Sequence, residues 1–182
     1  MIAPRARRAL RRLSGTTGVS VNFLSGRTVA DLAARVRVGG ARYLGNDGLE
    51  SGWLVRSGRP DRIRVQNLPG FEAFIARANG LADAVAADIG ASWLVVERKG
   101  PAVTFHYRGA PDVAAAGVRV RAVVDRLDSA RGFVRHPGAR MLELRPEGAT
   151  TKAQAIVELL AEVRPGLALT LGDGGTDASA FV

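Results

Sequence analysis

The feature that most constrains the fold is a unit of one helix and two strands that occurs twice in succession. From Phe71 to Ile89, apolar residues lie three to four positions apart, which predicts a long helix that ends near Gly90. Two strands follow, over 93–97 and 102–107, and the Arg98-Lys99-Gly100-Pro101 segment between them predicts a hairpin. This helix and hairpin form the first half of a compact α+β module.

The second half of the module repeats that order. Residues 112–127 predict a helix, and residues 132–136 and 140–144 predict a second hairpin about Pro137-Gly138. The sequence therefore predicts an α+β module over residues 71–148.

The segment before this module has the pattern of an α/β protein. A helix is expected over Pro4–Leu13, with proline at its start, and a β-rich strand over Val19–Leu24. That strand runs into a short turn and a helix capped by Thr28, and strand, turn and helix begin a βαβ unit. Short strands are also expected about Tyr43-Leu44 and over Trp53–Val55, and polar turns over 57–69.

The segment after the module returns to the α/β pattern. Thr150 or Thr151 is expected to cap a helix, and Leu167–Leu171 is a fully apolar strand of the kind found inside parallel sheets. The sequence therefore predicts an incomplete α/β core with a parallel sheet, made of residues 1–70 and 149–182, into which the α+β module is inserted.

Composition narrows the classes of function. A net charge of +9 could indicate nucleic-acid binding, but the arginines are spread over the chain and no helix carries a stripe of basic and aromatic residues. We therefore expect attraction for an anionic small molecule and not for nucleic acid. The sequence has no cysteine, which suits the cytoplasm, and no apolar run near the roughly 20 residues that span a membrane.

Two acidic residues follow the expected apolar strand. Asp173 and Asp177 lie in a glycine-rich loop, and ligands of α/β sheets bind beyond the carboxyl ends of the strands. Carboxylates at that position are suited to bind Mg²⁺. The same residues could instead cap a helix, and the sequence alone weighs the two interpretations about equally.

Ser25 and Lys152 are candidates for binding an anion. Ser25 lies between a strand and a helix, where a hydroxyl and backbone N–H groups can hold a phosphoryl oxygen. Lys152 lies at the start of a helix, where a cation opposes the helix dipole unless a phosphate or a carboxylate cluster is close. Taken alone, Ser25 also fits a plain strand-to-helix turn, and Lys152 a solvated surface lysine.

Polar residues collect on the expected strands of the α+β module. Strand residues can converge on one face and form a pocket suited to a sugar, although the solvated side of a half-buried sheet would have the same pattern. The candidates are Glu97, Lys99, His106, Tyr107, Arg108, Glu143 and Arg145.

Seven segments, taken in order, match the motifs of one protein family. They are Leu24-Ser25-Gly26-Arg27, Tyr43-Leu44-Gly45-Asn46-Asp47-Gly48-Leu49-Glu50, Glu97-Arg98-Lys99-Gly100, His106-Tyr107-Arg108, Glu143-Leu144-Arg145-Pro146, Lys152 and Gly172-Asp173-Gly174-Gly175-Thr176-Asp177. With them, the chain resembles the trehalose-phosphate phosphatases of the haloacid dehalogenase superfamily from about Pro4 to its end. Asp47 stands where that family usually has histidine.

The resemblance implies a haloacid dehalogenase-like Rossmannoid core with an inserted α+β cap domain, and hydrolysis of trehalose 6-phosphate to trehalose and phosphate. In that family an aspartate attacks phosphorus to form an aspartyl-phosphate, which water hydrolyses, while Mg²⁺ aligns the phosphate. By motif, Ser25 and Lys152 would bind the phosphoryl group, and Asp173 and Asp177 would bind Mg²⁺. The residues that would bind the rest of the substrate are Glu97, Lys99 and Glu143, with Arg27, Asn46, His106 and Arg145.

The sequence departs from the family at the first motif. No Asp-x-Asp-Gly-Thr occurs in it, and Gly174 replaces an aspartate of the last motif. We therefore expect that the chain as given lacks the nucleophile and does not hydrolyse the substrate. Two explanations stay open: an incompletely represented phosphatase, or a catalytically inactive homologue that binds or senses a sugar phosphate.

Overall fold

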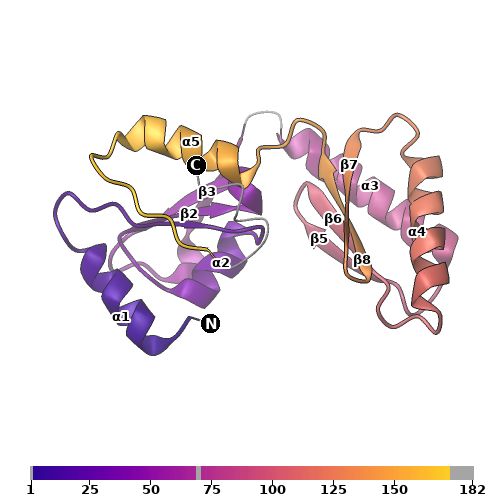
Figure 1. Ribbon diagram of the computed structural model, residues 1–182, viewed down its shortest axis with the longest axis horizontal. Helices are drawn as coiled ribbons and strands as arrows, with labels where there is room; N and C mark the ends of the chain where they lie inside the picture. The colour runs from indigo at the N-terminus through magenta and orange to yellow at the C-terminus, as the bar shows by residue number, and fades with distance from the viewer. Residues whose placement is uncertain (1, 69–70, 173–182) are drawn as a thin grey trace. The chain divides into compact units, whose positions relative to one another are not determined.

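The computed structural model describes residues 2–68 and 71–172. The chain divides into two compact units, which are coloured along the chain in Figure 1. Unit 1 comprises Met1–Leu68 and Thr150–Val182, and unit 2 comprises Pro69–Ala149. No described helix combines the length and the apolar character needed to cross a membrane.

Unit 1 contains a four-stranded sheet in the order β1-β2-β3-β4. The β1–β2 pair is parallel, and the other two pairs are antiparallel. The strands are β1 (Asn22–Leu24), β2 (Ala41–Gly45), β3 (Glu50–Leu54) and β4 (Arg64–Asn67). The helices are α1 (Pro4–Leu13), α2 (Val29–Val36) and α5 (Lys152–Val163), with the short 3-10 turns η1 (Asn46–Gly48) and η2 (Pro60–Arg62).

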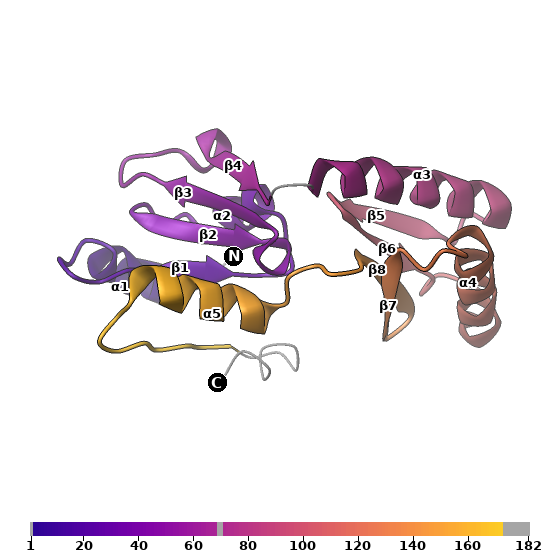
Figure 2. The ribbon, with the colours of Figure 1, turned by 90° about the horizontal axis from the view of Figure 1, so that it is seen from above.

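Helices α2 and α5 lie on opposite faces of this sheet, as the two views in Figures 1 and 2 show. Successive side chains of a strand point to opposite faces. Tyr43 of β2 is fully buried in the cluster that contains Val29 of α2. Its neighbour Arg42 pairs instead with Glu162 of α5, with 2.7 Å between nitrogen and oxygen. The alternation within β2 therefore places one helix on each side.

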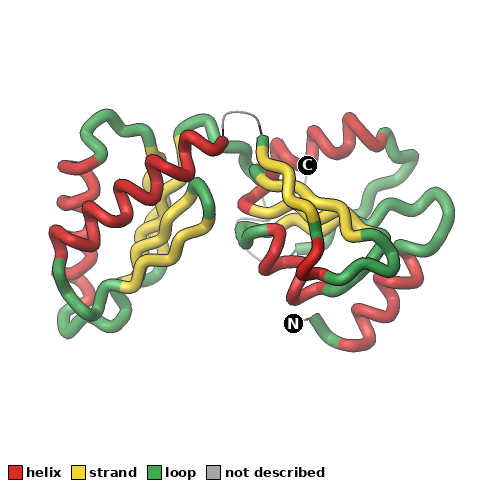
Figure 3. Tube along the Cα trace, turned by 180° about the vertical axis from the view of Figure 1, so that it is seen from behind, coloured by secondary structure: helices red, strands yellow, loops and turns green. Residues whose placement is uncertain are grey.

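Unit 2 is an antiparallel sheet with two helices on one face, coloured by element type in Figure 3. The strand order is β5-β6-β8-β7. The elements are α3 (Phe71–Ile89), β5 (Val95–Lys99), β6 (Ala102–His106), α4 (Val113–Leu127), β7 (Phe133–Gly138) and β8 (Met141–Pro146). Phe105, Leu142 and Leu144 are buried with α3 and α4, which leaves the alternate residues of each strand on the face without helices.

The prediction of a strand over Leu167–Leu171 is wrong. This segment pairs with none of the described strands, and Leu167 is 89% exposed. A strand requires a neighbour that accepts and donates its backbone hydrogen bonds, and an apolar sequence alone supplies no such neighbour. Of the described strands, β1 contacts only β2, so the parallel part of the sheet consists of one pair.

Three smaller expectations also need correction. The segment 57–69, expected to form turns, contains β4. Strand β7 continues through Pro137, because β7 is an edge strand and there proline removes no interior ladder bond. Tyr107 lies on the core side and is 5% exposed, because it follows His106 and strand side chains alternate.

Candidate functional site

In unit 1, the turn after β1 and the turn after β2 are joined by backbone hydrogen bonds. The N–H of Asn46 donates to the carbonyl of Arg27 at 2.7 Å, and the N–H of Asp47 donates to the carbonyl of Ser25 at 2.9 Å. Gly45 makes this approach possible, because a β-carbon there would collide with the backbone of Val29. The η1 turn is thus fixed beside the backbone of Ser25.

The Glu50 carboxylate connects the η1 turn to the start of α2. One carboxylate oxygen accepts a hydrogen bond from the Asn46 side-chain amide at 2.7 Å, and the other accepts from the Val29 N–H at 2.8 Å. Val29 is the first residue of α2, so Glu50 also satisfies an N–H group that the helix leaves unpaired. The sequence motif contains Glu50 but does not indicate its role, because its partners come from two other elements.

Asn46 and Asp47 are buried in an unusual backbone conformation. Their φ angles are +47° and +58°, and they are 4% and 2% exposed. Left-handed conformations are uncommon outside glycine and often mark functional sites. The Asn46 side-chain oxygen is buried without a hydrogen-bond partner among the residues described.

Helix α5 brings Lys152 to the same turn. Thr151 caps the helix in a capping box with Gln154, and the β-carbon of Ala155 packs where a side chain at Gly48 would lie. The Lys152 ammonium lies 3.9 Å from a carboxylate oxygen of Asp47, and its side chain is only 16% exposed. This low exposure excludes the alternative interpretation of Lys152 as a solvated surface lysine. The Asp47 carboxylate is one anion beside this helix start.

Arg27 points away from this group. Its guanidinium pairs with Asp31 of α2 at 2.9 Å, and Arg35 pairs with the same carboxylate at 2.8 Å. Partial burial acts to raise the pKa of Asp31, but the two arginines hold it below its ordinary value. The structure thus brings Ser25, Asn46 and Lys152 together and directs Arg27 to the exposed surface of α2.

In unit 2, five of the expected sugar-binding residues lie on the face without helices. Cross-strand register pairs Glu97 of β5 with Thr104 of β6, and Thr104 with Glu143 of β8. Lys99 lies between the two acids, with its ammonium 3.5 Å from a carboxylate oxygen of each. The remaining contacts are Glu97 to His106 at 2.9 Å and Arg145 to Glu143 at 3.3 Å.

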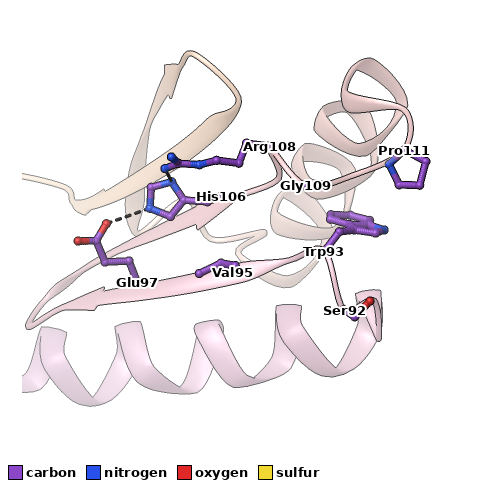
Figure 4. A pocket seen from close by; sticks show the side chains of 8 residues that line it. All are labelled: Ser92, Trp93, Val95, Glu97, His106, Arg108, Gly109 and Pro111. Carbon is purple, nitrogen blue, oxygen red and sulfur yellow. Dashed lines mark hydrogen bonds and ion pairs between the residues drawn. The ribbon is translucent and has the colours of Figure 1, made fainter.

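A pocket of about 720 Å³ continues this face beyond Glu97 and His106, as Figure 4 shows. Its residues are Ser92, Trp93, Val95, Glu97, His106, Arg108, Gly109 and Pro111. Partial burial acts to raise the pKa of Glu97, but the hydrogen bond from His106 and the charge of Lys99 hold it below its ordinary value. An ionised acceptor beside apolar surface suits a sugar ring, which has hydroxyls at its edge and C–H groups on its faces.

Trp93 was missed in the sequence. It lies in the turn before β5, so strand alternation does not place it, and its side chain both lines the pocket and packs against the core of unit 2. Thr104 was missed too: it is fully buried between the two acids, and no described group bonds its hydroxyl.

The expected metal ligands Asp173 and Asp177 lie outside the described residues. Within residues 2–68 and 71–172, no group of three or more acidic, histidine or cysteine side chains could hold a metal ion. The described part of the chain holds the Lys152–Asp47 pair in unit 1 and a polar face in unit 2.

Comparison with known proteins identifies the family of this chain. The sequence profile of the trehalose-phosphatase family matches residues 1–182. An uncharacterized glycosyl hydrolase of Mycobacterium tuberculosis is 39% identical over 186 residues, covering 97% of this chain and 13% of that protein. A trehalose-phosphate phosphatase of Mycobacterium avium is 37% identical over 187 residues, covering 95% of this chain and 43% of the relative. The chain thus spans less than half the length of either relative.

Solved structures agree on the fold. The crystal structure of a trehalose-6-phosphate phosphatase related protein superposes with a TM-score of 0.71 at 18% identity, over 99% of this chain and 72% of that one. This likeness confirms the fold class predicted from the sequence.

Proposed function

The chain belongs to the trehalose-phosphatase family, and from that premise we propose that it binds trehalose 6-phosphate for hydrolysis to trehalose and phosphate. Unit 1 acts as the haloacid dehalogenase-like core and unit 2 as the inserted cap domain. Ser25 and Lys152 bind the phosphoryl group, assisted by Asn46. In this proposal the residues that bind the sugar are Glu97, Lys99, His106, Glu143 and Arg145.

One observation carries the proposal for the phosphoryl group. Lys152 is far from Ser25 in sequence, yet its ammonium lies beside the turn that is hydrogen-bonded to Ser25. A cation held at low exposure at a helix start is suited to bind a phosphoryl oxygen. Arg27 would have to leave Asp31 in order to contribute.

Mg²⁺ is part of the proposal through Asp173 and Asp177. Carboxylate oxygens are suitable ligands for this ion, which would neutralise charge on the phosphoryl oxygens. No Asp-x-Asp-Gly-Thr occurs in residues 1–182. We therefore propose that these residues bind the substrate without supplying the nucleophile that forms the aspartyl-phosphate.

Two substitutions separate the phosphoryl site from the sugar site. Lys152→Met should weaken binding of inorganic phosphate and trehalose 6-phosphate and leave trehalose binding unchanged. Lys99→Met should weaken binding of trehalose and trehalose 6-phosphate and leave phosphate binding unchanged. Each lysine makes charge-assisted contacts that are worth about 1.5–3 kcal/mol, so each loss should be roughly 10- to 150-fold.

Calorimetry with the three ligands measures these effects. Arg98→Met is the matched control for Lys99, because Arg98 pairs with exposed Asp83 and not with the polar face. Folded protein that binds neither trehalose nor trehalose 6-phosphate would refute the proposal.

The second candidate is a catalytically inactive homologue that binds or senses a sugar phosphate. It is favoured by Gly174, which stands where the last motif of the family has a second aspartate. Residues 1–182 should release no phosphate from trehalose 6-phosphate in either case, and release would contradict both candidates. The DNA upstream of Met1 separates them: an in-frame Asp-x-Asp-Gly-Thr would favour the phosphatase, and its absence would favour the inactive homologue.

A further inference from the structure

We infer that Asp47 is a positioning residue that sets the charge of the phosphoryl site. Its carboxylate holds the ammonium of Lys152, and its negative charge weakens the binding of a phosphoryl dianion at the same lysine. This inference rests on the proposed function, because it takes Lys152 as a ligand of the phosphoryl group. It assigns to Asp47, in the η1 turn, a role in setting the affinity for the phosphoryl group.

The burial of Asp47 is the first argument. Asp47 and Asp128 are the acidic side chains that the described part of the chain buries. Asp128 has an evident structural role, since it accepts hydrogen bonds from Gly132 and Phe133 and pairs with Arg135. The cation beside Asp47 is Lys152, which is itself a candidate ligand. A buried charge is costly unless it is paired, so these two side chains stabilise each other's position.

The backbone of the turn is the second argument. Asp47 has a φ of +58°, and the preceding Asn46 has +47°. This conformation is held by hydrogen bonds to Arg27 and Ser25 and by the Glu50 carboxylate. These contacts fix the backbone from which the Asp47 carboxylate extends toward Lys152.

Charge gives the direction of the effect. The Asp47 carboxylate and a phosphoryl group both carry negative charge, and both are attracted to the same ammonium. The Asp47 carboxylate lies 3.9 Å from the Lys152 ammonium, and even with the screening of bulk water this attraction is equivalent to roughly a 5-fold change in affinity. Removing the charge while keeping the side-chain shape should therefore strengthen phosphate binding by about 5-fold or more.

The variant Asp47→Asn tests this directly. Asparagine has nearly the same shape and tolerates a positive φ, so the turn can form without the charge. Inorganic phosphate should bind about 5-fold or more tightly, with no change in the affinity for trehalose. The gain should disappear when Asp47→Asn is combined with Lys152→Met, because the two charges act on each other. Asp31→Asn is the control, since Asp31 is a carboxylate of the same unit that pairs with Arg27 and Arg35.

The possible outcomes distinguish failure of this inference from failure of the proposed function. If the unmodified protein binds phosphate and Asp47→Asn binds it equally or more weakly, the inference is overturned while the proposed function stands. If neither protein binds phosphate, both are overturned. Should Asp47→Asn lose its fold by circular dichroism, Asp47→Gly replaces it, because glycine adopts this φ without strain, and the same gain is expected.

Discussion

Glu50→Ala should destabilise unit 1 far more than its partly exposed position suggests. The carboxylate accepts hydrogen bonds from Asn46 at 2.7 Å and from the first N–H of α2 at 2.8 Å. Hydrogen bonds to a charged group contribute about 1.5–3 kcal/mol each, and the two share one acceptor, so their contributions do not simply add. We expect unit 1 to lose about 3 kcal/mol of unfolding free energy.

The two tryptophans allow each unit to be followed separately. Trp53 lies in unit 1 and Trp93 in unit 2, and the sequence has no other tryptophan. In a Trp93→Phe background, urea unfolding followed by fluorescence therefore reports on unit 1. With a slope of about 1–3 kcal/mol per molar urea, Glu50→Ala should lower the midpoint by roughly 1–3 M.

Asp61→Ala is the control for this experiment. Asp61 is an exposed carboxylate of the same unit that pairs with Arg59 at 3.2 Å. Exposed pairs contribute about 0–1 kcal/mol, so the midpoint should hardly move. If Glu50→Ala changed the stability of unit 1 no more than this control does, Glu50 would not hold the η1 turn, and the argument that Asn46 and Asp47 are fixed by it would be wrong.

Two further predictions concern unit 2. Asp128→Ala removes a buried carboxylate that pairs with Arg135, so the unfolding free energy reported by Trp93 in a Trp53→Phe background should fall by about 3–5 kcal/mol, and an unchanged value would contradict this role. The pKa of Glu97 is held below its ordinary 4.5 by His106 and Lys99, so its stabilising contribution is present above that pH and is lost as pH falls through the lower folded-state value. Melting temperatures measured below pH 4.5 should therefore fall more steeply for the unmodified protein than for Glu97→Gln, and parallel curves would contradict the prediction.

The helices of both units were predictable because their determinants are local. Thr28 and Thr151 cap α2 and α5, and Pro4 begins α1, as their positions in the sequence predict. The polar face of unit 2 was predictable for a similar reason. Glu97 and Lys99 are two residues apart, so a strand presents them on one side whatever its neighbours are.

The segment Leu167–Leu171 marks the limit of this reasoning. Its apolar sequence fits a buried strand, but a strand forms only where another strand pairs with its backbone. None of the described strands does so, and the leucines of this segment are exposed. The composition and periodicity of a segment show which secondary structure it can form, and its neighbours in the fold determine whether that structure forms.

Lys152 shows which part of a site sequence reasoning can reach. A lysine in the first turn of a helix opposes the helix dipole, so the sequence indicated either a nearby anion or a solvated side chain. The identity of the anion was not predictable, because Asp47 reaches the lysine only when α5 packs on η1. That packing depends on Gly48, since any β-carbon there would occupy the place of Ala155. The local sequence thus indicates the electrostatic alternatives, and contacts between distant segments determine which of them holds.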